Sequence, residues 1–235
     1  MSNLTAFGDL STDPCPMRLE PVGATVTLED AGVSLGGHAV LRGISLSLGP
    51  AEVLGIAGPN GSGKTTLLRL LATLVRIDDG SGKVLGAALG TAEVYVVRPE
   101  IGLIGHVPSL IAELSLRENL EHAARLAGKD VTRVDRALRV VGLEGAADRK
   151  VTQSSHGMLR RAEVARLLLT RPRLLLLDEA FSGLDTSARD LIDTLVERCV
   201  SAGGSVVMVS HDATSLADRA ERIVNITAGR IEAAA

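Results

Sequence analysis

The stretch "GPNGSGKTT" at residues 58–66 decides the fold of this chain. It fits the pattern Gly-x-x-x-x-Gly-Lys-Ser/Thr, it follows the apolar run "EVLGIAG", and it opens a run with helical spacing at 64–75. Glycines let backbone N–H groups face a polyphosphate without a Cβ in the way, and the helix N-terminus adds partial positive charge. We therefore expect a phosphate-binding loop formed by Gly58, Pro59, Asn60, Gly61, Ser62, Gly63, Lys64, Thr65 and Thr66. Within it, Lys64 is expected to reach the β- and γ-phosphates, and Thr65 to offer its hydroxyl to Mg²⁺.

Two more predicted strands end in polar groups. "RLLLLDEAF" (173–181) places four leucines before two acids, as in a buried central strand. Asp178 is then expected at the carboxyl end of the strand, holding Mg²⁺ through water. Glu179, on the opposite side of the strand axis or at its bend, can polarise the attacking water. "SVVMVSHD" (205–212) places His211 at the end of a neighbouring strand, beside Glu179, where a neutral imidazole can bind the γ-phosphate.

The remaining pattern predicts an α/β fold. Strands are expected at 24–30, 40–48, 52–58, 100–107, 174–178, 205–210, 222–226 and 230–232, with a turn at 78–86 that leads into a short strand. Helices are expected at 64–75, 115–127, 131–141, from 155 to before Pro172, at 186–200 and near 214–220. Alternating strands and helices predict a mostly parallel sheet with helices on both faces. We expect a disordered tail at 1–18 and one domain at 19–235, with a helical subdomain at about 108–163.

Composition restricts the classes of partner. The net charge is −3 without a basic block, and Phe and Tyr together contribute three residues, which argues against nucleic acid. The N-terminus lacks the pattern of a signal peptide, and no run approaches the ~20 apolar residues of a membrane span. We expect Cys15 and Cys199 to be free thiols in a reducing compartment, and the protein to be soluble or held at a membrane through a partner.

Taken together, these motifs resemble the ATPase subunits of the ATP-binding cassette (ABC) family over about residues 24–232, and "SGLD" (182–185) adds to the likeness. The family has a signature of the type Leu-Ser-Gly-Gly-Gln at the start of a helix. Here "SSHGM" (154–158) holds that place: Ser155 and Gly157 match, whereas Ser154, His156 and Met158 depart from the pattern. The resemblance implies a P-loop NTPase (RecA-like) fold, in which the mostly parallel sheet is joined by an antiparallel β subdomain and a helical insert. It also implies ATP and Mg²⁺ as ligands, and a head-to-tail dimer with a second copy or a similar ATPase chain.

The resemblance also implies roles for further residues. Ser155, with His156 and Gly157, would contact the γ-phosphate of ATP bound by the other subunit, since a serine at a helix N-terminus forms an anion site. Asp185 is similar to the dimer-contact aspartate of the family. Leu35 holds the place of an aromatic that stacks on adenine, so we expect apolar contact there. His106 holds the place of a glutamine that contacts Mg²⁺ and senses the membrane partner.

The function implied is an Mg-dependent ATPase that drives a membrane transporter, bound to transmembrane permease subunits at the cytoplasmic face of the inner or plasma membrane. "GLIGHVPSLIAELSLRENL" (102–120) resembles the haem-exporter ATPases of cytochrome c maturation, and "SSHGM" those of drug, antibiotic or polysaccharide exporters. An exporter is favoured, with haem as one candidate cargo. A soluble ABC ATPase of iron–sulfur cluster assembly is the alternative. A GTPase is disfavoured because the chain lacks an Asn-Lys-x-Asp motif, and a small-molecule kinase because it would not need residues 154–158.

Overall fold

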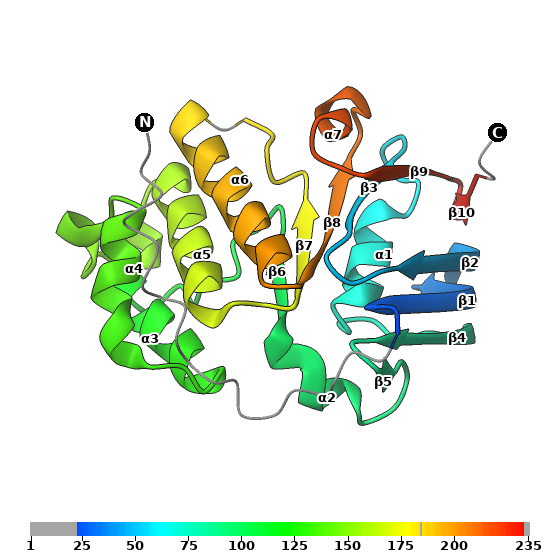
Figure 1. The fold of residues 1–235 in the computed structure, drawn as a ribbon, viewed down its shortest axis with the longest axis horizontal. Helices are drawn as coiled ribbons and strands as arrows, with labels where there is room; N and C mark the ends of the chain where they lie inside the picture. The colour runs from blue at the N-terminus through cyan, green and yellow to red at the C-terminus, as the bar shows by residue number, and fades with distance from the viewer. Residues whose placement is uncertain (1–22, 184, 233–235) are drawn as a thin grey trace. The chain divides into compact units, whose positions relative to one another are not determined.

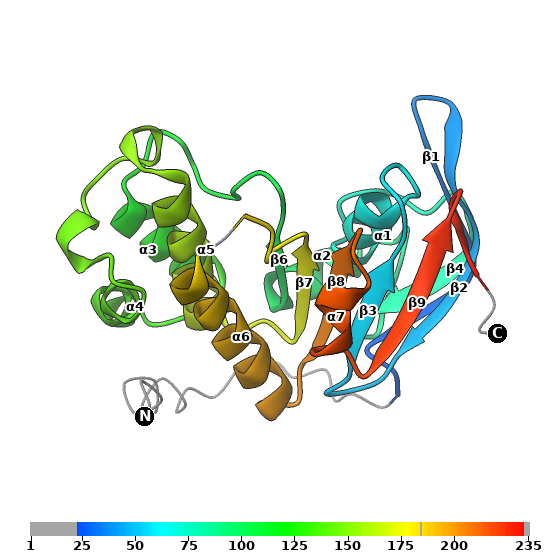
Figure 2. The same cartoon turned by 90° about the horizontal axis from the view of Figure 1, so that it is seen from above.

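A six-stranded sheet contains the three strands that lead into the sequence motifs, β3, β7 and β8. The computed structural model describes residues 23–183 and 185–232. In the sheet the strand order is β10-β9-β3-β8-β7-β6, so β8 lies between β3 and β7 (Figures 1 and 2). The pairs β9–β3, β3–β8, β8–β7 and β7–β6 are parallel, and β10 is antiparallel to β9. The strands are β3 (Val53–Ala57), β6 (Ile101–Ile104), β7 (Leu174–Asp178), β8 (Ser205–Ser210), β9 (Arg222–Thr227) and β10 (Arg230–Ile231).

Both faces of this sheet are covered, which explains the unbroken apolar runs in β7 and β8. Alternate residues of these strands share one hydrophobic cluster with leucines of α1 (Lys64–Leu71). On β3, a Cβ on Gly55 would lie 3.0 Å from Ile223, 3.1 Å from Ala220 and 3.4 Å from Leu216 of α7 (Thr214–Ala217). The small size of Gly55 therefore suits the close approach of this segment.

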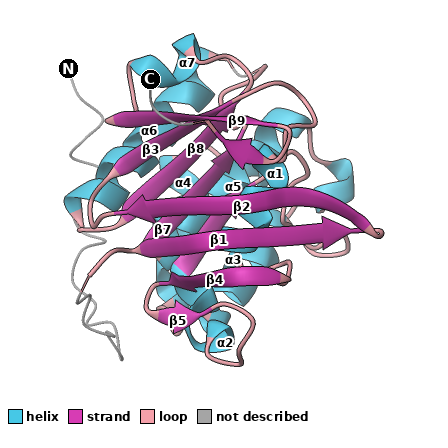
Figure 3. Ribbon diagram, turned by 90° about the vertical axis from the view of Figure 1, so that its right-hand side faces the viewer, coloured by secondary structure: helices cyan, strands magenta, loops and turns pink. Residues whose placement is uncertain are grey.

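A second sheet is antiparallel, with the order β2-β1-β4-β5 (Figure 3). Its strands are β1 (Val26–Leu35), β2 (His38–Leu48), β4 (Asp79–Val84) and β5 (Ala87–Ala88). The first strand was expected to end near residue 30 and the second to begin at 40, and both limits were wrong. Irregularities in the register, with Asp30 at a φ of 49°, let β1 continue to Leu35. Gly36 and Gly37 both have positive φ and form the two-residue turn into β2.

Two other expectations at the level of elements were also wrong. Residues 79–84 form strand β4 instead of a turn, because its glycines fit against β1: a Cβ on Gly82 would lie 2.6 Å from Leu28. Helix α1 ends at Leu71 instead of continuing to 75. Thr73 adopts a φ of 59°, and Arg98 donates hydrogen bonds to its hydroxyl and carbonyl oxygens. A short helix, α2 (Val94–Val97), was not predicted.

The chain divides into two compact units. Among described residues, the helical unit contains 107–171, 181–183 and 185–195; the sheet unit contains 23–106, 172–180 and 196–232. The helices that begin in the helical unit are α3 (Leu116–Leu126), α4 (Val134–Val140), α5 (His156–Thr170) and α6 (Thr186–Ser201). The predicted capping box of α3, between Ser115 and Glu118, is confirmed. The predicted tail at 1–18 lies outside the described residues.

Candidate nucleotide-binding and catalytic site

The phosphate loop follows β3 directly and leads into α1. Its glycines at 58, 61 and 63 all have positive φ, at 154°, 78° and 108°. A Cβ on Gly58 would lie 2.2 Å from the carbonyl oxygen of Ile226, which is backbone and cannot move aside. A Cβ on Gly63 would lie 2.8 Å from Leu41 of β2. The path of the loop is therefore open only to glycine at these two positions.

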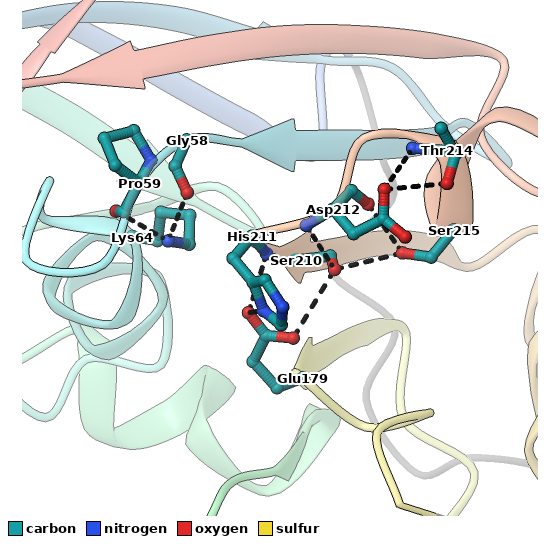
Figure 4. A network of polar contacts seen from close by, with 9 residues as sticks. All are labelled: Gly58, Pro59, Lys64, Glu179, Ser210, His211, Asp212, Thr214 and Ser215. Atoms are coloured by element: carbon teal, nitrogen blue, oxygen red, sulfur yellow. Dashed lines mark hydrogen bonds and ion pairs between the residues drawn. The ribbon is translucent and has the colours of Figure 1, made fainter.

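Lys64 folds back on the loop. Its ammonium donates to the carbonyl oxygens of Gly58, at 2.7 Å, and of Pro59, at 2.9 Å (Figure 4). Gly63, the N-cap of α1, provides no side-chain acceptor, and the first turn holds no acidic residue. The N–H groups at the start of α1 are thus not used by a side-chain cap, as a site for an anion requires.

Glu179 and His211 meet at adjacent strand ends. The register pairs Asp178 with Val209, which places Glu179 level with Ser210. Glu179 Oε1 accepts a hydrogen bond from the backbone N–H of His211 at 2.7 Å and lies 3.0 Å from its Nδ1 (Figure 4). Glu179 has a φ of 52°, so the chain bends at this residue. Of the two positions expected from the sequence, the opposite side of the strand axis or its bend, the residue takes the second. The expected neighbourhood of His211 and Glu179 is confirmed.

Ser210 is a site residue that the sequence analysis missed. Its hydroxyl is 3.4 Å from Glu179 Oε2, accepts from the N–H of Asp212 at 3.1 Å, and lies 3.0 Å from the hydroxyl of Ser215 (Figure 4). Asp212 accepts from the N–H and hydroxyl of Thr214, and these bonds hold its pKa below the usual range. The network ties the chain after β8 to the start of α7. The available signal was a polar residue ending an otherwise apolar strand.

The residues expected around Mg²⁺ fit that ion chemically. Asp178 is 8% exposed at the carboxyl end of β7, and Thr65 is exposed in the first turn of α1. Mg²⁺ prefers oxygen ligands and keeps several waters, so one carboxylate and one hydroxyl suffice when phosphates supply the rest. No group of three or more His, Cys, Asp or Glu residues that could hold a metal occurs within 23–183 and 185–232. His106 is exposed two residues beyond β6, and its metal contact stays a prediction.

The expected adenine contact, Leu35, is the last residue of β1 and is 38% exposed. It pairs with His38, and two residues earlier Val33 pairs with Leu41, the residue that contacts Gly63. An exposed leucine on this hairpin offers an apolar surface without an aromatic ring. Its role with adenine stays a prediction.

The residues expected to act on a second subunit lie in the helical unit. Ser155 is the N-cap of α5, and its hydroxyl accepts from the N–H of Met158 at 3.3 Å. Ser155, His156 and Gly157 are all exposed, so the start of the helix is open to solvent. Asp185 accepts from the N–H of Ala188 and the hydroxyl of Ser187 near the start of α6, and these bonds lower its pKa.

The sequence profile of the ABC transporter family matches residues 41–182, more than half of the chain. The chain belongs to the ABC transporter family. The resemblance drawn from the motifs is thereby confirmed, as is the P-loop NTPase fold. This ABC protein is an ATPase that binds and hydrolyses ATP. No helix within its described residues is both long and apolar enough to cross a membrane.

Named relatives of this ABC ATPase include export and import proteins. Cytochrome c biogenesis ATP-binding export protein CcmA 2 of Cupriavidus metallidurans is 36% identical, over 80% of this chain and 90% of the relative. Daunorubicin resistance ATP-binding protein DrrA3 of Streptomyces coeruleorubidus is 37% identical, over 88% of this chain and 66% of the relative. Fe(3+) ions import ATP-binding protein FbpC of Streptomyces coelicolor is also 37% identical, over 88% of this chain and 60% of the relative.

Among solved structures, an ATP-binding cassette in a dimeric, post-hydrolysis state with ADP and Pi is 27% identical, with a TM-score of 0.78. The similarity covers 88% of this chain and 97% of that one. This likeness supports the assignment of the fold to an ABC ATPase.

Proposed function

We propose that this ABC ATPase is the motor of a membrane exporter, and that it hydrolyses Mg·ATP at the interface of a head-to-tail dimer. The observation that carries the proposal is the contact between Glu179 and His211. A carboxylate and an imidazole meet at the ends of β7 and β8, next to the strand that feeds the phosphate loop. A base and a hydrogen-bonding group so placed can serve water attack on a bound terminal phosphate.

Each residue has a task in this proposal. Lys64 exchanges its two loop carbonyls for phosphate oxygens when ATP binds. Glu179 accepts a proton from the attacking water. The backbone N–H and Nδ1 of His211 hold the Glu179 carboxylate, which leaves the ring nitrogen Nε2 for the γ-phosphate. Thr65 and Asp178 would hold Mg²⁺, which when bound neutralises phosphate charge.

The dimer is supported by the open start of α5. The Ser155 hydroxyl accepts the N–H of Met158, and residues 155–157 are exposed to solvent. The serine and the N–H groups of this first turn can therefore receive an anion from a second subunit. The dimeric ATP-binding cassette among the similar structures supports the same assembly. The second subunit is another copy of this chain or a similar ATPase.

A permease is proposed as the membrane partner, which would hold the protein at the cytoplasmic face of the membrane. The segment after β6 supports this, since Val107 is 75% and Ile111 41% exposed although both are apolar. Export is supported by the name of the CcmA 2 relative, an ATP-binding export protein, and a related import protein makes direction a point for experiment. Haem is one candidate cargo. The comparisons do not favour the iron–sulfur assembly alternative.

The test is recovery of the tagged chain from detergent-solubilised membranes of its own cells. We expect a protein with several membrane spans to copurify, and ATP-dependent movement of cargo into inside-out vesicles to demonstrate export. The variant Val107→Asp should lose the membrane protein, whereas Leu126→Asp, at a residue 70% exposed at the end of α3, should keep it. Recovery of a soluble scaffold alone would support the iron–sulfur alternative, and ATP-dependent movement out of the vesicles would show an importer.

A further inference from the structure

A buried ion pair lies inside α5. Glu163 is 0% exposed and Arg160 5% exposed, and the guanidinium donates to Glu163 Oε2 at 3.1 Å. The second carboxylate oxygen, Oε1, accepts from the backbone N–H of Ser109 at 2.9 Å. Burial raises the pKa of Glu163, and the bond from Ser109 opposes that rise. A buried carboxylate is costly without partners, and the hydrogen bonds from Arg160 and Ser109 offset that cost.

The segment that contains Ser109 is held at a second point. Asn119 of α3 is 4% exposed; its Oδ1 accepts from the N–H of Ile111 at 2.7 Å, and its Nδ2 donates to the carbonyl of Ile111 at 3.1 Å. The same Nδ2 donates to the carbonyl of Ser115 at 2.9 Å. Residues 109–111 are therefore fastened by two buried polar side chains, one on α5 and one on α3.

Glu163 and Ser155 belong to the same helix, with Glu163 about two turns from the N-cap. We propose that Glu163 is a positioning residue, which through the N–H of Ser109 ties residues 109–111 to α5 and so sets the position of Ser155. The role of Ser155 in this inference rests on the proposed function. A helix moves as a rigid element over two turns, so a displacement of residues 109–111 is carried to its start.

The consequence is a direct path for movement within the helical unit. Ile111 belongs to the segment 109–111 and Val107 lies two residues before it, and both side chains are exposed. A displacement of this segment acts on α5 through the hydrogen bond between the Ser109 N–H and Glu163 Oε1. Glu163 touches neither substrate nor reacting atoms in this account; it acts through the helix.

The experiment compares Ser109→Pro with Ser109→Ala. Proline removes the donor N–H and leaves Glu163 in place, whereas alanine removes only the side chain and keeps the N–H. In a Glu179→Gln background we expect Ser109→Pro to weaken ATP-dependent dimerisation, measured by sedimentation equilibrium, about fivefold or more. Ser109→Ala should match the parent, and ATP affinity of the monomer should be unchanged in both.

A second readout needs no dimer. Hydrogen exchange of the isolated chain should be faster at amides 159–163 in Ser109→Pro than in Ser109→Ala. If Ser109→Pro fails to fold, the double variant Arg160→Met with Glu163→Leu removes both charges and the acceptor at similar volume, and must give the same exchange result. If amides 159–163 exchange as slowly in Ser109→Pro, or in the double variant that replaces it, as in Ser109→Ala, the inference is overturned. A parent that does not dimerise with ATP overturns the proposed function alone, because the exchange result stands independently.

Discussion

Glu179→Gln separates ATP binding from hydrolysis most cleanly. The amide is nearly the same size and keeps an oxygen for the His211 N–H that Glu179 Oε1 now accepts at 2.7 Å. It cannot take a proton from water, so the rate of hydrolysis should fall by about 10²–10⁴-fold, the usual contribution of a general base. Lys64 and the loop glycines are untouched, so ATP should still bind.

The cost to folding should be small. The substitution exchanges a hydrogen bond to a charged acceptor for a neutral one, a difference of about 1 kcal/mol in the free energy of unfolding. For a chain of this size that corresponds to a decrease of roughly 2–4 °C in Tm. A larger loss would indicate that Glu179 is mainly structural.

The assay is phosphate release at saturating Mg·ATP, with equilibrium binding of a fluorescent ATP analogue in parallel. Glu221→Gln is the matched control, because it makes the same chemical change at an exposed residue of the sheet unit. It should hydrolyse ATP at the wild-type rate. Hydrolysis by Glu179→Gln at that same rate would refute the role of Glu179 as base.

Three further outcomes are expected. Lys64→Ala should lower the affinity for ATP by about 2–5 kcal/mol, measured by calorimetry, since a charge partner of the phosphates is lost; unchanged binding would count against the phosphate loop. Gly58→Ala should lower Tm and ATP affinity more than Gly61→Ala, because a Cβ at 58 meets Ile226 O at 2.2 Å, whereas one at 61 has nothing within 4 Å; equal effects would show that the crowding is tolerated. Burial raises the pKa of Cys199 from 9.0 to about 12, so its contribution to stability is present below pH 9 and is lost as the pH rises towards 12; alkylation of the Cys199 peptide at pH 8 should therefore be far slower in native than in urea-unfolded protein, and comparable rates would show that the thiol is accessible.

The sequence predicted the elements whose signals are local. The phosphate loop, the leucine strand β7 and the capping box of Ser115 and Glu118 each depend on residues that are neighbours in the chain. β4 was missed because glycine is a poor strand former, and only the nearness of Leu28 shows why Gly82 suits this strand.

The rest of the site depends on contacts between distant segments. Nothing in the helical spacing marks Glu163 as buried, since its partner Ser109 comes from a segment 54 residues earlier. Ser210 is significant only because the strand order brings β8 next to β7. The sequence indicated that both strands end in polar groups, and the sheet shows which of these side chains meet.

A crystal structure of the Glu179→Gln variant with Mg·ATP tests the central claim most directly. The account predicts two chains arranged head to tail, with Ser155 of each within hydrogen-bonding distance, about 3 Å, of the γ-phosphate held by Lys64 of the other. A loaded monomer, or a dimer in which Ser155 faces solvent away from both nucleotides, would contradict it.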